Sequence, residues 1–465
     1  MKDPAIPSTM AQIDAINYQE ILDLDSCTPP AALRERSVPD LGTEPFSVDR
    51  YTDQDFFDRS IERMWLKTWQ MACREEEIPN VGDYINYDIV GKSLIIVRSA
   101  PGEFKALHNS CLHRGRKLVT EPGHAASFRC PFHGFTWKRD GSFLRNPVAW
   151  DFPHCKPSEF GLPEAKLARW GGFIFVNFDQ DAAPLEQYLD PIPRHFARWN
   201  LENKYIAVHV KKAAKCNWSI TLEAFLEPYH STATHPQIIP FMADANAQFD
   251  VYSPHVTRHI GARGFQSPQV AREYTQQEIA EALIGPGSRI YSVLGGNVDT
   301  RLPDGVSARS YTATLLRKLL AEETGIDHSE VSDTELFDDL MYIVFPNFCV
   351  FGGFGKNFVF RFLPRGKKHD ESTMEVYFLK TVPKGQDRPS AAKMNEVPDD
   401  QPWGSAAELG NLGPVLDQDW DNLPQTQEGL EASETGVVNY GHYLDLPIRR
   451  HQLTLDAYMR GDMPG

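Results

Sequence analysis

The sequence predicts an α+β protein in which a small antiparallel β domain precedes a larger mixed domain. Residues 81–180 consist of short β-like runs that Gly and Pro interrupt, which is typical of such a β domain. Beyond residue 181, helix-like and strand-like segments occur in clusters without strict βαβ alternation. The length of 465 residues is enough for two or three domains with large cores.

The N-terminal segment is the first element in chain order. Residues 1–47 are rich in Pro, Ser and Asp and show weak periodicity, so we expect an arm wrapped over the body or over a neighbouring molecule. From 53 to 69, apolar side chains such as Phe57 and Trp65 recur at helical spacing. This pattern predicts an amphipathic helix within residues 52–70, which we expect to pack on the larger domain.

The larger domain shows a mixed pattern of helix-like and strand-like segments. Residues 385–415 are rich in Pro, Gly, Asn and Asp and are expected to form a long surface excursion. No glycine-rich nucleotide fingerprint follows a strand, so reducing power is expected to come from another protein. We expect helices over 184–199, 218–230, 276–284, 310–323 and 447–460, and strands over 204–213, 287–294, 341–351, 357–363 and 373–381.

Composition excludes several classes of protein. The net charge of −16 without a basic run argues against nucleic acid or an anionic membrane as the main partner. No apolar stretch is long enough for a membrane span, and the first residues do not form a signal peptide. The seven cysteines are odd in number and spread over the chain, so we expect no disulfide scaffold and a cytoplasmic location.

Two Cys–His pairs form the first chemical motif. Cys111 and His113 are followed, after sixteen residues, by Cys130 and His133. Zinc fingers usually pair Cys with Cys and His with His, although zinc remains an alternative for any such set. Mixed pairs suit a [2Fe–2S] cluster in which two thiolates hold one iron and two imidazoles hold the other. The imidazoles raise the reduction potential of such a cluster above that of an all-Cys cluster.

A pair of histidines forms the second motif. His230 and His235 are five residues apart, which is about 140° on a regular helix, so an unbroken helix would not aim both at one metal. Pro228 kinks a helix, and Pro236 keeps His235 out of the helical region. A helix that ends between the histidines can turn His235 back. Glu227 lies on the face of His230 and can fix its tautomer.

A third ligand is needed for an iron site of this kind. Two imidazoles and one carboxylate on one side of a metal form the facial triad of non-haem Fe(II) oxygenases. An acidic segment further along the chain contains Asp417, Asp419 and Asp421. An acidic run is usually a solvated face, so the residues alone leave the choice among the three open.

Both motifs resemble those of one known family. The segments Asn-Ser-Cys111-Leu-His113-Arg-Gly and Cys130-Pro-Phe-His133-Gly-Phe-Thr-Trp resemble the Rieske domain of ring-hydroxylating oxygenases. With the second motif, the resemblance to the α subunit of Rieske non-haem iron oxygenases spans about residues 50–460. It implies an all-β Rieske domain over 48–180. It also implies a catalytic domain over 181–465, built on an antiparallel sheet covered by helices.

The resemblance implies two metal centres. Cys111, His113, Cys130 and His133 would hold a [2Fe–2S] Rieske cluster, and His230 and His235 a mononuclear Fe2+. The family places its ligand Asp in an acidic segment ahead of a Gln-x-Gly. Counting back from Gln427 makes Asp419 the best match, with Asp417 and Asp421 as alternatives.

The resemblance also implies an activity and partners. The chain would be a terminal oxygenase component that takes electrons from a separate reductase or ferredoxin, with NAD(P)H acting only through that partner. It would activate O2 and hydroxylate an aromatic or other small organic substrate, as in aromatic hydrocarbon catabolism. An O- or N-demethylating monooxygenase is one alternative, and a Rieske electron carrier without oxygenase activity is an alternative of another class. The length and the second histidine pair argue against the carrier.

The family usually assembles as a head-to-tail homotrimer. In that arrangement the cluster of one subunit faces the iron of the next, and a carboxylate bridges the two histidines. Glu227 matches this catalytic bridging position, with His230 and His133 of the partner subunit as its expected contacts. Many members carry Asp here, so the longer Glu changes the reach of the bridge.

Overall fold

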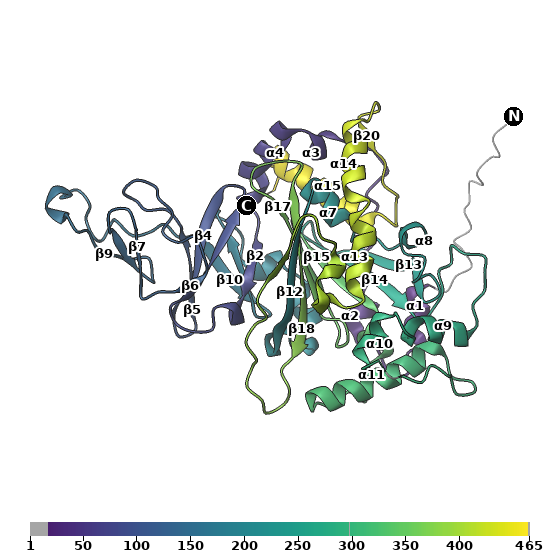
Figure 1. Ribbon diagram of the computed structural model, residues 1–465. Helices are drawn as coiled ribbons and strands as arrows, with labels where there is room; N and C mark the ends of the chain where they lie inside the picture. Colours follow the sequence, from purple (N-terminus) through teal and green to yellow (C-terminus); the bar gives the residue numbers. More distant parts are fainter. Residues whose placement is uncertain (1–16, 297, 464–465) are drawn as a thin grey trace.

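The protein is elongated, with a small β-rich part projecting from a larger body (Figure 1). This computed structural model describes residues 17–296 and 298–463. Within these ranges no helix combines the length and the apolar character needed to cross a membrane. The α+β class expected from the sequence is confirmed, because the projecting part is all-β and the body combines a large sheet with helices.

The projecting part contains three small sheets in which every neighbouring pair of strands is antiparallel. Their strand orders are β5-β4-β3-β6, β7-β8-β9 and β10-β11-β2. The strands are β2 (Gln70–Arg74), β3 (Asp83–Ile89), β4 (Lys92–Ala100), β5 (Glu103–His108), β6 (Gly123–His124), β7 (Ser127–Arg129), β8 (Thr136–Lys138), β9 (Phe143–Arg145), β10 (Lys166–Trp170) and β11 (Phe173–Asn177).

Strand β4 links two cores, because successive side chains of a strand point to opposite faces. Ile96 joins the core shared with the body. Ile95 and Val97 instead join the core that contains Trp137 and the two motif cysteines. Because alternate side chains of β4 pack in these two cores, this one strand connects the core around the motif cysteines to the core of the body.

One large sheet organises the body, in the order β13-β14-β15-β16-β17-β18-β12-β19. All its pairs are antiparallel except the edge pair of β12 and β19. The strands are β12 (Lys204–Ala214), β13 (Met242–Val251), β14 (Val256–Arg263), β15 (Asp339–Val344), β16 (Phe348–Phe351), β17 (Phe358–Pro364), β18 (Ser372–Thr381) and β19 (Asn395–Val397).

Helices cover this sheet, as expected for the catalytic domain (Figure 1). Leu222, Leu416 and Leu455 bring three helices into one core with the sheet residue Val376. A separate core holds the helices between β14 and β15 together. The covering helices are α7 (Trp218–Glu223), α13 (Leu412–Trp420) and α15 (Leu446–Arg460); the separate group is α9 (Gln276–Ile284), α10 (Arg289–Val293), α11 (Ala308–Thr324) and α12 (Asp333–Phe337). Further helices are α5 (Leu185–Tyr188), α6 (Ile192–Phe196), α8 (Ser231–Thr234) and α14 (Leu423–Glu431).

The described part of the N-terminal arm lies on the body of its own chain. The hydroxyl of Tyr18 donates to Asp338 at 3.0 Å, and the amide of Ser37 donates to Asp250 at 2.7 Å. Residues 1–16 of the predicted arm lie outside the described residues, and the domain boundaries at 47 and 180 stay predictions. The elements of the arm are α1 (Tyr18–Asp23), α2 (Ala31–Arg34) and β1 (Phe46–Ser47), which pairs with β20 (Val437–Val438).

The helix expected within 52–70 is interrupted. Asp53 separates α3 (Asp49–Thr52) from α4 (Gln54–Ser60), because its side chain caps α4 by accepting from the amide of Asp55. A π-helical turn then runs from Ile61 to Trp65. Trp65 packs edge-on against Trp218 of α7, with 4.8 Å between ring centroids, so this segment packs on the body.

Four expected elements differ from the structure. The helix expected over 184–199 is divided into α5, α6 and a 3₁₀ turn from Ala197 to Trp199. Residues 287–294 contain the helix α10 rather than a strand, because Ile290 packs in the helical core instead of pairing with the sheet. The strand expected over 341–351 is two strands, and Pro346, which has no N–H to donate, lies in the turn between them. The helix expected over 218–230 ends at Glu223.

The excursion expected over 385–415 is only partly a surface segment. It contains β19 and two 3₁₀ turns, and the side chain of Trp403 is fully buried against Trp420 of α13. The polar composition of the segment gave no indication that Trp403 would be buried. Burial of this large side chain removes much apolar surface from water and holds the segment on the body.

Candidate metal centres

The two Cys–His pairs lie on two loops of the same geometry at the tip of the projecting part. The amide of Gly115 donates to the carbonyl of Cys111 at 2.8 Å, and the amide of Gly134 donates to that of Cys130 at 2.9 Å. Both glycines have positive φ, at +74° and +77°, which a side chain would strain. The repeated turn therefore presents each Cys in the same position, while His113 is the second and His133 the third residue after its Cys.

The motif cysteines approach each other inside this tip. Both side chains are buried, and each thiol affects the pKa of the other. Burial raises the pKa of Cys111. Burial also opposes ionisation of Cys130, but amide donors from Phe132 and His133 outweigh it and lower the pKa of that thiol. Amides that stabilise a thiolate are what a cysteine ligand of a metal centre requires.

The two motif histidines face each other beside the cysteines. The rings of His113 and His133 lie 4.7 Å apart between centroids. Nδ1 of His113 is buried and has no hydrogen-bond partner among the described residues. Buried polar atoms normally have partners, so this nitrogen fits a metal ligand. Two thiols and two imidazoles in this arrangement match the donor set of a Rieske cluster.

The second histidine pair lies where a helix breaks. After α7 ends, the chain follows an irregular path until His230 begins the single turn of α8. His235 ends that turn with φ of −125°, outside the helical region, as expected before Pro236. The two rings consequently lie 5.2 Å apart between centroids.

Asp419 of α13 completes a group of three possible metal ligands. Its Oδ1 lies 2.9 Å from Nε2 of His235 and 3.6 Å from Nε2 of His230, and the ligand atoms of all three residues lie within 4.8 Å of one another. Nδ1 of His235 donates to Gln418 and Nδ1 of His230 to Glu227, each at 2.8 Å. Because these acceptors occupy the outer nitrogens, both Nε2 atoms are free to face one metal ion.

The neighbouring carboxylates point elsewhere. Asp417 accepts from the amides of Trp403 and Gly404 and so anchors the preceding loop. Asp421 is exposed. Of the three candidates in the acidic segment, the structure brings only Asp419 to the histidines.

The electrostatic environment of His230 is dominated by carboxylates. Burial alone would lower the pKa of this imidazole, but Glu227 and then Asp419 raise it. A protonated imidazole and a bound cation compete for the same carboxylates, so this surplus of negative charge also favours a metal cation.

A cavity of about 660 Å³ opens beside this group, and we call it the acidic cavity. No Lys or Arg is among its described lining residues. Glu223 is half-buried in its wall and accepts from the hydroxyls of Tyr51 and Tyr440 at 3.0 and 2.9 Å; desolvation raises its pKa. Sequence reasoning missed Glu223, although it lies one helical turn before Glu227. The lining includes Glu223, Glu227, Asp419, Asp445, His230, Tyr51, Tyr229 and Tyr440.

Two family models match the chain. The model of the ring hydroxylating alpha subunit (catalytic domain) matches residues 194–461, more than half of the chain. The model of the Rieske [2Fe-2S] domain matches residues 68–154. The first match contains His230, His235 and Asp419, and the second contains both Cys–His pairs.

Several curated proteins are similar in sequence. The glycine betaine monooxygenase oxygenase subunit of Pseudomonas aeruginosa is 28% identical over 211 residues, covering 45% of this chain and 48% of the relative. The carnitine monooxygenase oxygenase subunit of Escherichia coli is 28% identical, covering 40% and 50%. The biphenyl 2,3-dioxygenase subunit alpha of Rhodococcus jostii is also 28% identical, covering 40% and 42%. The chain thus spans about half the length of the curated relatives it matches.

Solved structures share the fold over nearly the whole chain. A quaternary ammonium Rieske monooxygenase in complex with L-carnitine aligns with a TM-score of 0.61 at 16% identity, covering 91% of this chain and all of the other. Naphthalene 1,2-dioxygenase from Rhodococcus sp. aligns with a TM-score of 0.59 at 19% identity, covering 90% and 95%.

Proposed function

Because the chain belongs to the ring hydroxylating alpha subunit family and contains a Rieske [2Fe–2S] domain, we propose that it is the terminal component of an oxygenase. The convergence of His230, His235 and Asp419 carries this proposal. When bound, a Rieske cluster supplies single electrons, and a mononuclear Fe2+ with three protein ligands supplies open positions for O2. The substrate is an aromatic or other small organic molecule, and the electrons come from a separate reductase or ferredoxin.

Each ligand residue has a defined role in this proposal. Cys111, Cys130, His113 and His133 hold the cluster. His230, His235 and Asp419 hold the iron, while Gln418 and Glu227 orient the imidazoles through their outer nitrogens. The protein otherwise positions the substrate and excludes water.

Colour and metal content test this proposal against its rivals. The purified protein should be red-brown, bleach with dithionite and contain about three irons per chain. About two irons per chain would instead indicate an electron carrier. A colourless protein with bound zinc would contradict the proposal.

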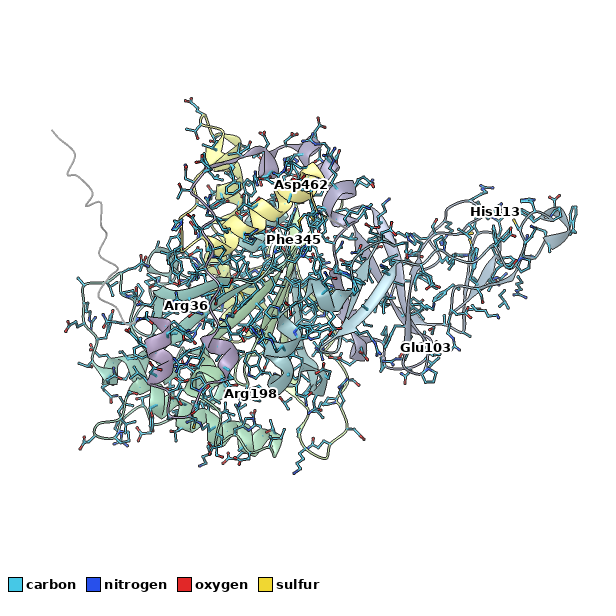
Figure 2. All side chains as sticks on the ribbon, turned by 180° about the vertical axis from the view of Figure 1, so that it is seen from behind. Arg36, Glu103, His113, Arg198, Phe345 and Asp462 are labelled. Atoms are coloured by element: carbon cyan, nitrogen blue, oxygen red, sulfur yellow. The ribbon has the colours of Figure 1, made fainter. Side chains whose placement is uncertain are left out.

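Electron transfer between subunits is supported by the separation of the two centres. His113 lies on the projecting part, far from the body that holds α7, α8 and α13 (Figures 1 and 2). The tip around the Cys–His loops is basic, whereas the acidic cavity beside His230 is negative. Over residues 111–159 the charged residues are Arg114, Arg116, Lys117, Arg129, Lys138, Arg139, Arg145 and Lys156 against Glu121, Asp140, Asp151 and Glu159.

The tip also exposes apolar side chains. Trp150 is 82% exposed and Phe132 54%, and Leu112, Leu144 and Val148 are exposed as well. Clustered exposed apolar residues mark interaction surfaces. We infer a head-to-tail homotrimer in which each tip docks at the acidic cavity of the next subunit. Glu227, already bonded to His230, then reaches His133 of the partner subunit.

All seven cysteines are unpaired, which suits the reducing cytoplasm that we propose as the location of the protein.

Monooxygenation with O- or N-demethylation is a second candidate activity. It is favoured because two of the relatives above are monooxygenases named for glycine betaine and carnitine. Product analysis separates the candidates when aromatic, alicyclic and methylated amine or ether compounds are supplied with a generic reductase. A diol indicates dioxygenation, an alcohol indicates monooxygenation, and formaldehyde release indicates demethylation.

A further inference from the structure

Three cations gather on the helix-covered face of the large sheet, and we call them the basic cluster. Arg263 ends β14, Arg289 begins α10, and Lys356 lies between β16 and β17. Asp339 of β15 accepts from Nε of Arg263 at 3.1 Å and from Nζ of Lys356. Among the described residues no other carboxylate is bonded to these three side chains. Asp339 therefore binds two of the three cations, and Arg289 has no bonded carboxylate.

Arg289 is the least compensated of the three. Its guanidinium lies 4.2 Å above the ring centroid of Phe358 and 5.9 Å from that of Phe378. No oxygen of the described residues accepts a hydrogen bond from it. Burial, and then the charge of Arg263, lower its pKa to about 10. A partly buried cation without a bonded anion is unfavourable, so this position is suited to an anionic ligand.

The other two cations retain donors for such a ligand. Arg263 uses only Nε for Asp339, and its side chain remains 20% exposed. Burial, reinforced by Arg263, lowers the pKa of Lys356 to about 7. An anion placed here would stabilise the protonated lysine as well as the two guanidinium groups.

The imidazole of His259 lies between the basic cluster and the proposed iron site. His259 lies on the same face of β14 as Arg263, and both its ring nitrogens are buried without a hydrogen-bond partner among the described residues. The charges of Asp339 and Lys356 act on this imidazole from one site, and those of Glu227 and His230 from the other. Buried polar atoms normally have partners, so the two nitrogens of His259 are unused hydrogen-bonding groups that a polar ligand atom could satisfy.

Aromatic side chains cover the sheet in the same region. Phe358, Phe360 and Phe351 contact one another with centroid distances of 5.4 to 6.0 Å. Phe225, from the segment between α7 and α8, lies 5.6 Å from Phe360. The phenylalanines thus extend from the cation at Phe358 to the segment that carries His230.

We propose that Arg263, Arg289 and Lys356 bind the carboxylate of the organic substrate, whose apolar part lies along these phenylalanines toward the iron ligands. This inference rests on the proposed oxygenase function. The substrate class is a small, mostly apolar carboxylic acid. Planar guanidinium groups match the two oxygens of a carboxylate, and a charge-assisted hydrogen bond is stronger than a neutral one.

Matched carboxylates and amides test this proposal on the intact holoenzyme. Binding of acetate, benzoate, acetamide and benzamide is measured by calorimetry at constant ionic strength. We expect benzoate to bind about 10- to 100-fold more tightly than benzamide. Arg289→Gln and Arg263→Gln should each remove most of this preference. Arg272→Gln is the matched control, because Arg272 also lies over an aromatic ring, Tyr274 at 4.3 Å, but is exposed.

The outcomes separate this proposal from the oxygenase proposal. Equal binding of carboxylates and amides, or a preference that survives both substitutions, would overturn the carboxylate site even if the protein is red-brown and carries its iron. Binding of inorganic phosphate in place of the carboxylates would overturn it too. Failure of the oxygenase proposal would appear in colour and iron content instead.

A second variant covers loss of folding. If Arg289→Gln does not fold, Arg289→Lys keeps the charge and loses the planar fork. A drop of about 10-fold in benzoate affinity then supports the site, and wild-type affinity contradicts it.

Discussion

His230 and His235 differ in the group that holds their outer nitrogens, a carboxylate for the first and an amide for the second. A carboxylate makes the imidazole more basic, which strengthens it as a ligand. We predict that His230→Ala lowers turnover at least about 100-fold while the red-brown spectrum persists, because the cluster ligands lie on other loops. Loss of that spectrum would contradict the assignment of His230 to the iron.

The proposed role of Glu227 in electron transfer between the two metal centres needs a test of its own. Glu227→Gln removes the negative charge but keeps an acceptor for His230, so both metals should remain bound. We predict electron transfer slowed by about 10- to 100-fold in single-turnover experiments. Glu428→Gln, at an exposed position of α14, serves as the matched control. Wild-type rates in Glu227→Gln would remove this residue from the path.

Asp419 and Asp421 form a natural pair for metal analysis. Asp419→Ala should lower the catalytic iron content from about one per chain to a small fraction, since a facial triad loses one of three ligands. Asp421→Ala should leave it unchanged, because that side chain is exposed. Full occupancy in Asp419→Ala would direct attention to Asp417 or Asp421.

At the scale of elements, the two glycine turns carry the residues that we propose as cluster ligands. A Cβ added at Gly134 would lie 3.1 Å from Pro147 and 3.3 Å from Arg129, at φ of +77°. A Cβ at Gly102 would meet nothing within 4 Å at a similar φ of +74°. Gly134→Ala should therefore cost more than the roughly 1 kcal/mol expected for the backbone conformation alone, and it should lower cluster content.

Visible absorbance and thermal unfolding measure this difference. Gly102→Ala should keep the cluster, because only the backbone conformation is affected there. Equal cluster content in the two variants would show that the close approach at Gly134 does not matter for the turn.

The sequence was most informative where prolines interrupt a helical pattern. Pro228 and Pro236 predicted a helix that ends between His230 and His235, whereas α7 already ends at Glu223 and a separate turn, α8, lies between the two histidines. Asp419 could be chosen only through the family pattern, because its contact with the histidines joins segments more than 180 residues apart. Gln418 carries no sequence signal, since its role depends on the position of His235.

Apolar runs were the weaker guide to the elements. The run at 287–294 has no period that separates a strand from a helix, and its packing against other helices decides the outcome. Likewise, Trp403 gave an apparently polar excursion a buried anchor. Both cases depend on tertiary contacts that a local pattern does not contain.

At the scale of the whole molecule, the exposed tip predicts assembly. Trp150→Ser combined with Val148→Ser should weaken trimers and lower steady-state turnover, while the cluster spectrum stays intact. Leu24→Ser is the control, because Leu24 is 55% exposed on the arm, away from the tip. Light scattering and turnover measure the effect. A fully active double variant of unchanged mass would contradict docking through the tip.

The contact between Trp65 and Trp218 has a consequence for this assembly. The first residue ends the segment that leads into the projecting part, and the second begins the helix that leads to His230. In the proposed trimer, this contact would help to set how far each subunit extends toward the next. A rigid contact between Trp65 and Trp218 would therefore keep the distance between the two proposed metal centres constant. We therefore expect a substitution at Trp65 to slow the proposed electron transfer between subunits while every metal ligand stays in place.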